Sequence, residues 1–449
     1  MEVCREAEQE IGRMVNRVLR EKMVDLEATE LAVREMGQRI GGELLERIMN
    51  CQTAIPRIDV KCGAGHLARF KGWRKKRIVT VVGTVKLERG YYYCGKCAEG
   101  VMPEDTAIDV QGTSFSPGVR RMMGLVGAKE AFDEGRRDLE ELSGVKVSTK
   151  ALERASEAMG ADIESIGQLE CELAMKDKLD WLKPEEQINR MYIAIDGTGV
   201  PVVPAETRGR KGKQPDGRSK TREAKLGCVF TQTGYDKDGR PIRDPHSTTY
   251  VGAIEETENF GRRIYAEAVR RGIRDAKEMI VIGDAAPWIW TVAAKHFPDA
   301  IQIVDLYHAL EHLSEAGKAA YGTLNPKSAQ WIAAHREELK KGDIEAVIRS
   351  LKRLRPSDSQ AKKIIRKAIG YFTKNRDRMR YDEFRKRGLF VGSGVVEAGC
   401  KTVMGRRLKQ SGMRWTVRGA NSIIALRCCQ MSGRWEDYWE RRLGNNRNN

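Results

Sequence analysis

The sequence contains no apolar run long enough to cross a membrane, since a spanning helix needs about 20 consecutive apolar residues. Its start at Met1 reads MEVCREAE, which is acidic and polar and therefore unlike a signal peptide. Ten cysteines at irregular spacing in 449 residues do not form the pattern of a disulfide scaffold. These absences predict a cytoplasmic protein with no membrane partner.

Acidic residues are also in short supply relative to basic ones. The chain has 63 Asp and Glu against 80 Lys and Arg, which gives a formal net charge of +17 and a pI near 9.4. Such an excess predicts a polyanionic partner, because neutralising phosphates drives non-specific affinity for nucleic acid. The alternative is a soluble protein that is merely basic. The length predicts roughly two to four domains.

The first two segments differ in pattern. Residues 1–55 are charged and rich in helix formers, with apolar residues at helical spacing, which predicts an N-terminal helical segment. In residues 56–105, the run from Arg77 to Cys94 is β-branched and aromatic around a break at Gly83, which predicts two antiparallel strands.

This second segment also contains four soft metal-ligand candidates. Cys62-x3-His66 and Cys94-x2-Cys97 flank the predicted hairpin. Tetrahedral zinc accepts three cysteines and one histidine, so we predict a zinc-ribbon-like module with a structural Zn²⁺. The alternative is three unliganded cysteines and an unrelated histidine.

Residues 106–185 return to helical patterning and predict a helical DNA-binding region. A helix-turn-helix fits between Arg136 and Met159, with a turn at Ser143-Gly144-Val145 and a helix cap at Ser148 or Thr149. Helix pairs of this kind are also common without DNA binding.

The remainder predicts an α/β core interrupted by helices. Residues 186–310 form the first part, 311–388 an all-helical insertion, and 389–449 the last core helix with a basic C-terminal tail. The core strands are expected at 191–195, 226–232, 248–254, 278–283 and 300–304, with helices at 258–272 and 286–297 and a basic loop at 206–225.

Three isolated acids mark this core. Asp196 and Asp284 each end a short apolar run, and Glu397 follows the helical block. Phosphodiester chemistry uses two divalent ions roughly 3.5–4 Å apart, and Mg²⁺ prefers carboxylate oxygens, so these acids are candidate ligands of two Mg²⁺ or Mn²⁺ ions. Taken singly, Asp196 and Asp284 are equally explained as a turn former and a helix cap.

Lysine and arginine residues surround these acids in sequence. They fall in the loop after Asp196 and in the stretch after Glu397, where they are expected to contact DNA phosphates; the alternative for the loop is a solvated, disordered segment. The predicted DNA contacts are Arg208, Arg210, Lys211, Lys213, Lys401, Arg406, Arg407, Lys409 and Arg414. Trp415 is either a base-stacking residue or a core residue.

Four motifs carry a resemblance to a known family. They are Ile195-Asp-Gly-Thr-Gly-Val-Pro, Gly283-Asp-Ala-Ala-Pro-Trp-Ile-Trp, Val304-Asp-Leu-Tyr-His-Ala-Leu-Glu-His-Leu and Gly392-Ser-Gly-Val-Val-Glu. In this order they resemble bacterial insertion-sequence transposases of the DDE class, most closely the Kra-type group, distantly akin to Mutator-like transposases. The resemblance implies a ribonuclease H-like core with a helical insertion and a catalytic triad of Asp196, Asp284 and Glu397.

Asp305 and His308 match a further motif of that broader class. They are expected to brace the insertion or position DNA, although a simple buried histidine, or a metal face completed by His312, would also explain them. Glu311 is a second choice for the third carboxylate.

The sequence therefore predicts a transposase that binds the ends of its own element and cuts and joins double-stranded DNA. The family implies at least a homodimer, because two ends are held together, and a location at the nucleoid. The alternatives are a ribonuclease H-like nuclease without strand transfer and a domesticated DNA-binding regulator.

Overall fold

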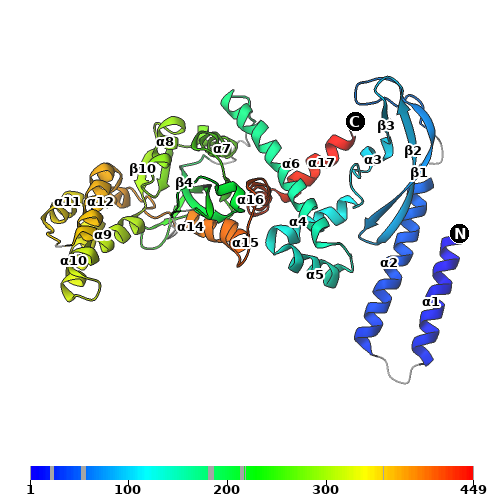
Figure 1. Cartoon of the computed structure of the whole chain (residues 1–449), viewed down its shortest axis with the longest axis horizontal. Helices are drawn as coiled ribbons and strands as arrows, with labels where there is room; N and C mark the ends of the chain where they lie inside the picture. Colours follow the sequence, from blue (N-terminus) through cyan, green and yellow to red (C-terminus); the bar gives the residue numbers. More distant parts are fainter. Residues whose placement is uncertain are drawn as a thin grey trace. The chain divides into compact units, whose positions relative to one another are not determined.

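The computed structural model describes residues 2–20, 25–51, 57–180, 187–212, 217, 219–356 and 358–447. The chain divides into two compact units: Met1–Met159 with Glu436–Asn449, and Gly160–Trp435 (Figure 1). No helix among the described residues is long and apolar enough to cross a membrane.

The first unit combines helices with a small antiparallel sheet of order β1-β2-β3. Its elements are α1 (Glu2–Arg20), α2 (Leu26–Cys51), β1 (Arg69–Thr80), β2 (Gly83–Cys94), β3 (Glu99–Val101), α3 (Pro103–Ala107), α4 (Pro117–Lys129) and α5 (Phe132–Ser143), with α17 (Trp435–Arg447) returning at the end of the chain. The predicted hairpin about Gly83 is confirmed.

The predicted helix-turn-helix geometry is also present. Helix α5 ends at Gly144, which has a left-handed φ of 72° that glycine adopts without strain. The next helix, α6 (Thr149–Met175), begins where the Ser148 hydroxyl accepts the Ala151 N–H at 3.1 Å. Leu139 of α5 and Leu152 of α6 share one buried cluster. DNA recognition by this helix pair stays a prediction.

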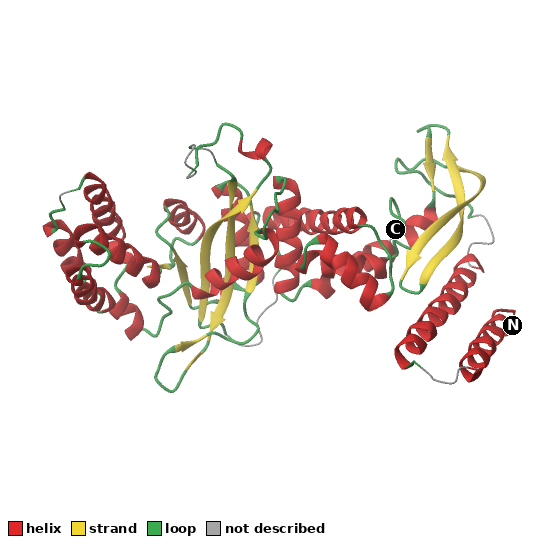
Figure 2. Ribbon diagram, turned by 60° about the horizontal axis from the view of Figure 1, so that its bottom comes forward, coloured by secondary structure: helices red, strands yellow, loops and turns green. Residues whose placement is uncertain are grey.

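The second unit is built on a mixed five-stranded sheet of order β10-β9-β4-β5-β8 (Figure 2). Strands β4, β9 and β10 are parallel, while β5 is antiparallel to both of its neighbours. The core elements are β4 (Arg190–Pro201), β5 (Thr221–Gln232), β8 (Thr249–Ala253), α7 (Thr257–Arg270), β9 (Glu278–Gly283), α8 (Pro287–His296) and β10 (Ile301–Val304).

All five predicted strands and both predicted helices of this core are confirmed, with two boundaries changed by several residues. Strand β4 continues past 195 to Pro201, so Asp196 lies within it and not at its end. Strand β5 begins at Thr221 and not at 226, because residues 221–225 pair with the far end of β4. The core also contains elements without a clear sequence pattern: the short hairpin of β6 (Gly234–Tyr235) and β7 (Pro241–Ile242) and the turns η1 (Pro204–Thr207) and η2 (Ile273–Asp275).

A block of helices follows β10, as predicted. It consists of α9 (Leu306–Tyr321), α10 (Pro326–Lys340), α11 (Ile344–Arg353), α12 (Ser359–Asn375), η3 (Arg376–Arg378) and α13 (Tyr381–Lys386). Side chains at the breaks cap the helices: Asn325 accepts the Lys327 N–H, Asp343 the Ala346 N–H, and Asp358 the Ala361 N–H.

The chain then returns to the sheet through a helix with an unusual centre. Helix α14 (Gly394–Gly399) continues into a π-helical segment, η4 (Cys400–Gly405), and then α15 (Arg406–Leu408), before α16 (Val417–Met431). The wider turn is stabilised by the buried Arg427 of α16, which donates to the carbonyl oxygens of Thr402 and Val403. Such π-helical turns occur frequently at functional sites.

Candidate active site

The two predicted catalytic aspartates lie at the same level on neighbouring parallel strands. Ile195 of β4 pairs with Gly283 of β9, and Gly283 pairs with Val304 of β10. Asp284 and Asp305 directly follow the ends of β9 and β10, whereas Asp196 lies within β4, which continues to Pro201. Ligands of open α/β sheets gather beyond the carboxyl ends of strands, and Asp196 is level with two such ends.

Asp196 and Asp284 interact electrostatically. Burial raises the pKa of Asp284 above its usual range, and the negative charges of Asp196 and Glu223 raise it further. The hydrogen bond from the Ala286 N–H and the charge of His308 lower this pKa, but by less. Asp196 Oδ1 accepts the Gly197 N–H and Asp284 Oδ1 accepts the Ala286 N–H. Neither bond uses both oxygens of its carboxylate. The alternative roles are not formed, because Asp196 lies within β4 and not in a turn, and α8 has Ala286 at its N-cap with no side-chain cap.

Glu397 comes to the same edge from the far side of the helical block. Helix α14 packs against β4 and β5, and Glu397 lies 3.5 Å from His308 Nε2. Cys400 lies one turn after Glu397, and burial raises the pKa of its thiol. The negative charge of Asp196 and a hydrogen bond to Asp196 raise this pKa further. The helix that carries Glu397 is therefore in contact with Asp196, and His308 connects Glu397 to Asp284.

Asp305 occupies a bracing position. Its side chain is fully buried, Oδ1 accepts the His308 N–H at 2.8 Å, and Oδ2 accepts the Ser393 N–H. The neighbouring Leu306 N–H donates to the Val391 carbonyl oxygen at 2.9 Å. The carboxylate thus joins the start of α9 to the segment just before α14, which is the bracing role expected from the sequence.

The metal face of Asp305, His308 and His312 is not formed. Among the described residues, Asp305 and His308 group with Glu397, their ligand atoms lying within 4.8 Å of one another, and His312 is not in this group. The His312 ring lies instead 4.0 Å from the Tyr371 ring, and burial lowers its pKa. Glu311, the second choice for the third carboxylate, lies 3.5 Å from His308 Nδ1 with its side chain 77% exposed.

Most of the predicted DNA contacts are accessible. Exposed side chains are those of Arg208, Arg210, Lys211, Lys401, Arg406, Lys409 and Arg414, while Lys213 lies outside the described residues. Lys409 donates to the hydroxyl of Thr198, two residues beyond Asp196 on β4. At least one cation of the C-terminal stretch therefore lies beside the carboxylates.

Arg407 was wrongly included among these contacts. Its side chain is fully buried, and its guanidinium lies 5.0 Å from the centre of the Trp415 ring. A group without solvent access is not available to a phosphate, and the cation–π contact explains how the charge is accommodated. Trp415, 7% exposed and donating Nε1 to the Leu408 carbonyl oxygen, is the core residue of the two alternatives.

Glu223 and Cys400 belong to the site but have no sequence signal. Glu223 pairs with Gly199 across β4 and β5, and its side chain fills the space beside Gly197, where an added Cβ would lie 2.9 Å from its carboxylate. Only the strand register, set by tertiary pairing, brings this acid toward Asp284.

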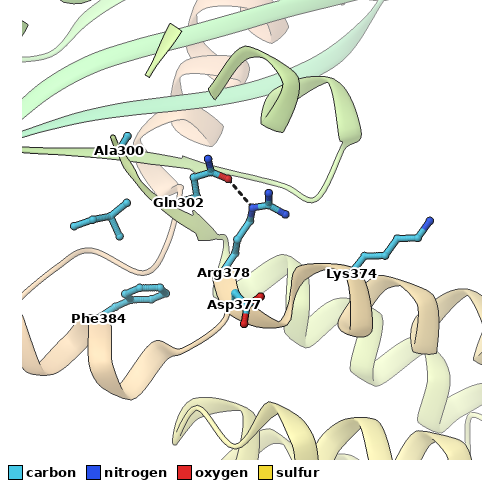
Figure 3. A pocket seen from close by; sticks show the side chains of 7 residues that line it. Ala300, Gln302, Lys374, Asp377, Arg378 and Phe384 are labelled. Carbon is cyan, nitrogen blue, oxygen red and sulfur yellow. Dashed lines mark hydrogen bonds between the residues drawn. The ribbon is translucent and has the colours of Figure 1, made fainter. Parts of the chain in front are cut away.

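A cavity of about 380 Å³ lies at the other end of β10 (Figure 3). Ala300, Gln302, Lys374, Asp377 and Arg378 line it, and Arg378 Nε donates to Gln302 Oε1 at 2.7 Å. The cavity is at the amino end of the strand, whereas the carboxylates follow its carboxyl end. It is therefore separate from the candidate active site.

The predicted zinc ligands also converge, in the first unit. One ligand atom from each of Cys62, His66, Cys94 and Cys97 lies within 4.8 Å of the others.

Residues 255–442 match the model of an uncharacterised protein family, UPF0236. The UPF0236 protein in the vanSb 3′ region of Streptococcus gallolyticus is 22% identical over 402 residues, covering 86% of this chain and 80% of that protein. A UPF0236 protein of Caldanaerobacter subterraneus subsp. tengcongensis is 22% identical over 418 residues, covering 90% and 78%, and its name joins eleven locus labels.

Among solved structures, a Drosophila P element transposase strand transfer complex matches with a TM-score of 0.26 and 9% identity, covering 75% of this chain and 83% of that one. At this TM-score the likeness is too weak to support a common fold. The UPF0236 description gives no function, so the resemblance to DDE transposases stays a prediction. The chain is thus similar to UPF0236 proteins, over residues 255–442 for the family model and at 22% identity for the two relatives.

Proposed function

We propose that this protein is a DNA transposase that cleaves and joins DNA by metal-dependent phosphoryl transfer. The observation that carries the proposal is the meeting of Asp196, Asp284 and the Glu397 helix at one edge of the sheet. The acids are 88 and 113 residues apart in sequence (284 − 196 and 397 − 284), yet β4 and β9 hold the two aspartates on neighbouring strands, and α14, which carries Glu397, packs against β4.

The sheet supports a ribonuclease H-like core. Numbered along the chain, its strands have the order 5-4-1-2-3, with only the second antiparallel to the rest. A mixed five-stranded sheet of this kind is compatible with the ribonuclease H-like core that the resemblance implies. The helical block lies between the fifth strand and the helix that carries the third acid, which is also the expected place of the insertion.

The carboxylates suit two hard divalent cations. Asp196 and Asp284 each retain a carboxylate oxygen outside their local hydrogen bonds, and Glu397 is 33% exposed. Bound Mg²⁺ or Mn²⁺ would supply charge neutralisation at the attacking and leaving oxygens. Burial and two neighbouring acids disfavour the ionised form of Asp284, and a cation would relieve this cost.

The protein's own groups have distinct roles in this proposal. Asp305 holds the start of α9 against the segment before α14, which fixes His308 beside Glu397. The exposed cations Lys401, Arg406 and Lys409, on the turns that follow Glu397, provide charge for the phosphates flanking the scissile bond.

The relatives support mobility of the gene. One protein name that joins eleven loci of a single bacterial strain is expected for a sequence that has copied itself within a genome. A nuclease or a domesticated regulator, the two alternative functions, has no comparable reason to be present in many copies.

An excision assay in cells tests the proposal. DNA flanking the gene brackets a selectable marker, and marker loss and reinsertion are measured with the wild type, Asp284→Asn and Glu311→Gln. We expect mobilisation by the wild type and by Glu311→Gln, whose carboxylate is exposed and replaceable, and none by Asp284→Asn.

Equal mobilisation by wild type and Asp284→Asn would remove Asp284 from the mechanism. Cleavage of the flanking DNA without reinsertion would favour the nuclease. Specific binding of that DNA without cleavage in Mg²⁺ or Mn²⁺ would favour the regulator.

A further inference from the structure

The Cys and His cluster of the first unit has the dimensions of a zinc site. Cys62 Sγ lies 3.7 Å from Cys97 Sγ, and His66 Nδ1 lies 3.2 Å from the same sulfur. Zinc–sulfur bonds of about 2.3 Å at tetrahedral angles separate two sulfur atoms by about 3.8 Å. A disulfide would require about 2.05 Å, so the arrangement matches shared coordination and not a bond between the thiols.

Two loops with defined backbone geometry present these ligands. In the first, the Cys62 N–H donates to the His66 carbonyl oxygen and the Gly65 N–H to the Cys62 carbonyl oxygen, both at 2.8 Å. In the second, Cys94 ends β2 and Cys97 stands in the turn before β3, followed by Ala98 with a φ of 55°. His66 and Cys94, the nearest ligands of the two loops, are 28 residues apart in sequence (94 − 66), and the hairpin between them brings the loops together.

Few buried apolar side chains stabilise this end of the hairpin. Its buried cluster consists of only Val60, Cys62, Ala68, Tyr92 and Cys94, with Cys97 and Val101 packed against it. Small modules with so small a core commonly depend on a disulfide or a metal. Cys62, Cys94 and Cys97 form no disulfide, which leaves a metal.

We propose that Cys62, His66, Cys94 and Cys97 bind one Zn²⁺ ion. Four protein ligands leave no open position, so the ion is structural and joins the loop before β1 to the end of β2. The site lies in the first unit, and its role does not depend on the transposase proposal.

Zinc content tests the assignment directly. The full-length wild type, Cys94→Ser, His66→Cys and the control Cys51→Ser, an exposed thiol outside the cluster, are purified without chelator and measured by mass spectrometry. We expect one zinc per chain in the wild type, in Cys51→Ser and in His66→Cys, which keeps four soft ligands, and loss in Cys94→Ser.

Cobalt provides a readout that does not depend on the folding of a variant. Wild-type protein stripped of metal and given Co²⁺ is expected to show the visible bands of tetrahedral thiolate coordination, which added Zn²⁺ abolishes. No zinc and no cobalt bands in the wild type, or equal zinc in Cys94→Ser and Cys51→Ser, would overturn the proposal.

A second, independent observation concerns the outer face of the same hairpin. Strand β1 carries six cations between Arg69 and Arg77 and no acid, and five of the six are exposed. Lys75 and Arg77 pair with Glu88 and Lys86 of β2, so all four lie on one face of the ribbon. Trp73, 38% exposed, shares that face.

We infer that this face binds the phosphates of double-stranded DNA. A two-stranded β-ribbon fits the major groove, and an array of Lys and Arg with one acid complements a phosphate backbone. This inference deepens the proposed function by assigning a DNA contact outside the catalytic unit, and its test requires no cleavage.

The salt dependence of binding tests this surface. Affinity for a duplex of arbitrary sequence is measured by fluorescence anisotropy across KCl concentrations for the wild type, the Lys75→Ala/Arg77→Ala double variant and a charge-matched control, Arg13→Ala/Arg20→Ala on α1. We expect the hairpin variant to bind more weakly and its logarithmic salt slope to fall by about 2, with the control unchanged. Equal slopes for all three would overturn the inference.

Discussion

Ile195 and Gly283 are partners in the register of β4 and β9, and each is followed immediately by an aspartate. An added Cβ on Gly283 would lie 2.9 Å from the Ile195 carbonyl oxygen. The close approach of the two strands therefore requires glycine at this position, and it sets the separation of Asp196 and Asp284.

Gly283→Ala is expected to disturb this approach. The alanine methyl group would force the strand ends apart, and overpacking of this kind costs about 1–3 kcal/mol in the free energy of unfolding. Because Asp284 is the next residue, DNA cleavage should fall more than stability alone explains. Urea unfolding and cleavage assays on the same protein measure both. Gly370→Ala, at a helical site with open space, is the control, and an equal effect of the two changes would contradict this account.

His308→Ala tests the link between Glu397 and Asp284. His308 Nε2 lies 3.5 Å from Glu397, and its charge acts on Asp284. Loss of a group that orients metal ligands typically costs 10–100-fold in metal affinity or activity, and about this loss is expected here. The Mg²⁺ concentration that gives half-maximal cleavage should rise while affinity for DNA without metal stays unchanged. An unchanged Mg²⁺ dependence would exclude the positioning role.

Arg427→Met tests the support of the π-helical turn. Arg427 Nε donates to the Val403 carbonyl oxygen at 2.5 Å, and a second nitrogen donates to the Thr402 carbonyl oxygen. Charged hydrogen bonds contribute about 1.5–3 kcal/mol each, so destabilisation by about 2–3 kcal/mol is expected. Cleavage should also fall, because Glu397 lies on the same continuous helix. Thermal unfolding measures the loss of stability. A variant as stable as the wild type would refute the claim that Arg427 supports the π-helical turn.

Asp109→Asn should reveal a pH-dependent contribution in the first unit. Arg442 and Arg120 outweigh the effect of burial and lower the pKa of Asp109, which accepts from them at 2.6–3.0 Å. A lowered folded-state pKa means that the stabilisation is present above about pH 4, the unfolded value, and is lost as pH falls through the folded-state pKa.

The substitution keeps the backbone, because Asp109 has a φ of 52°, which asparagine also adopts readily. At pH 7 it should destabilise the protein by about 3 kcal/mol, since two arginines lose their buried partner. Urea unfolding should show this difference shrinking below pH 4. A difference that is constant from pH 7 to pH 3 would contradict the electrostatic explanation.

Local patterns were sufficient to predict much of the core. The apolar runs before Asp196 and Asp284 are β-branched and short, and these properties alone predict buried strands. Likewise, Asn325-Pro326 predicts a helix start from local sequence alone, because the asparagine side-chain oxygen caps the first turn and proline fits the first helical position.

Features that depend on tertiary pairing could not be predicted in this way. Thr221 belongs to a strand only because β4 extends far enough to pair with it. Arg407 has the sequence signature of an exposed cation, yet Trp415 provides a buried site for its charge. Asp305 follows a short apolar run as Asp284 does, and the sequence gives no sign that its carboxylate accepts the Ser393 N–H, 88 residues away.

Cleavage of the gene's flanking DNA by purified protein tests the central claim most directly. The rate in Mg²⁺ is measured for the wild type, Asp196→Asn, Asp284→Asn, their double variant and the control Glu311→Gln. Residues that act as one unit are strongly non-additive, so each single variant should lose as much activity as the double variant, while the control cleaves normally. Wild-type cleavage by either single variant would contradict a shared catalytic role for the two aspartates.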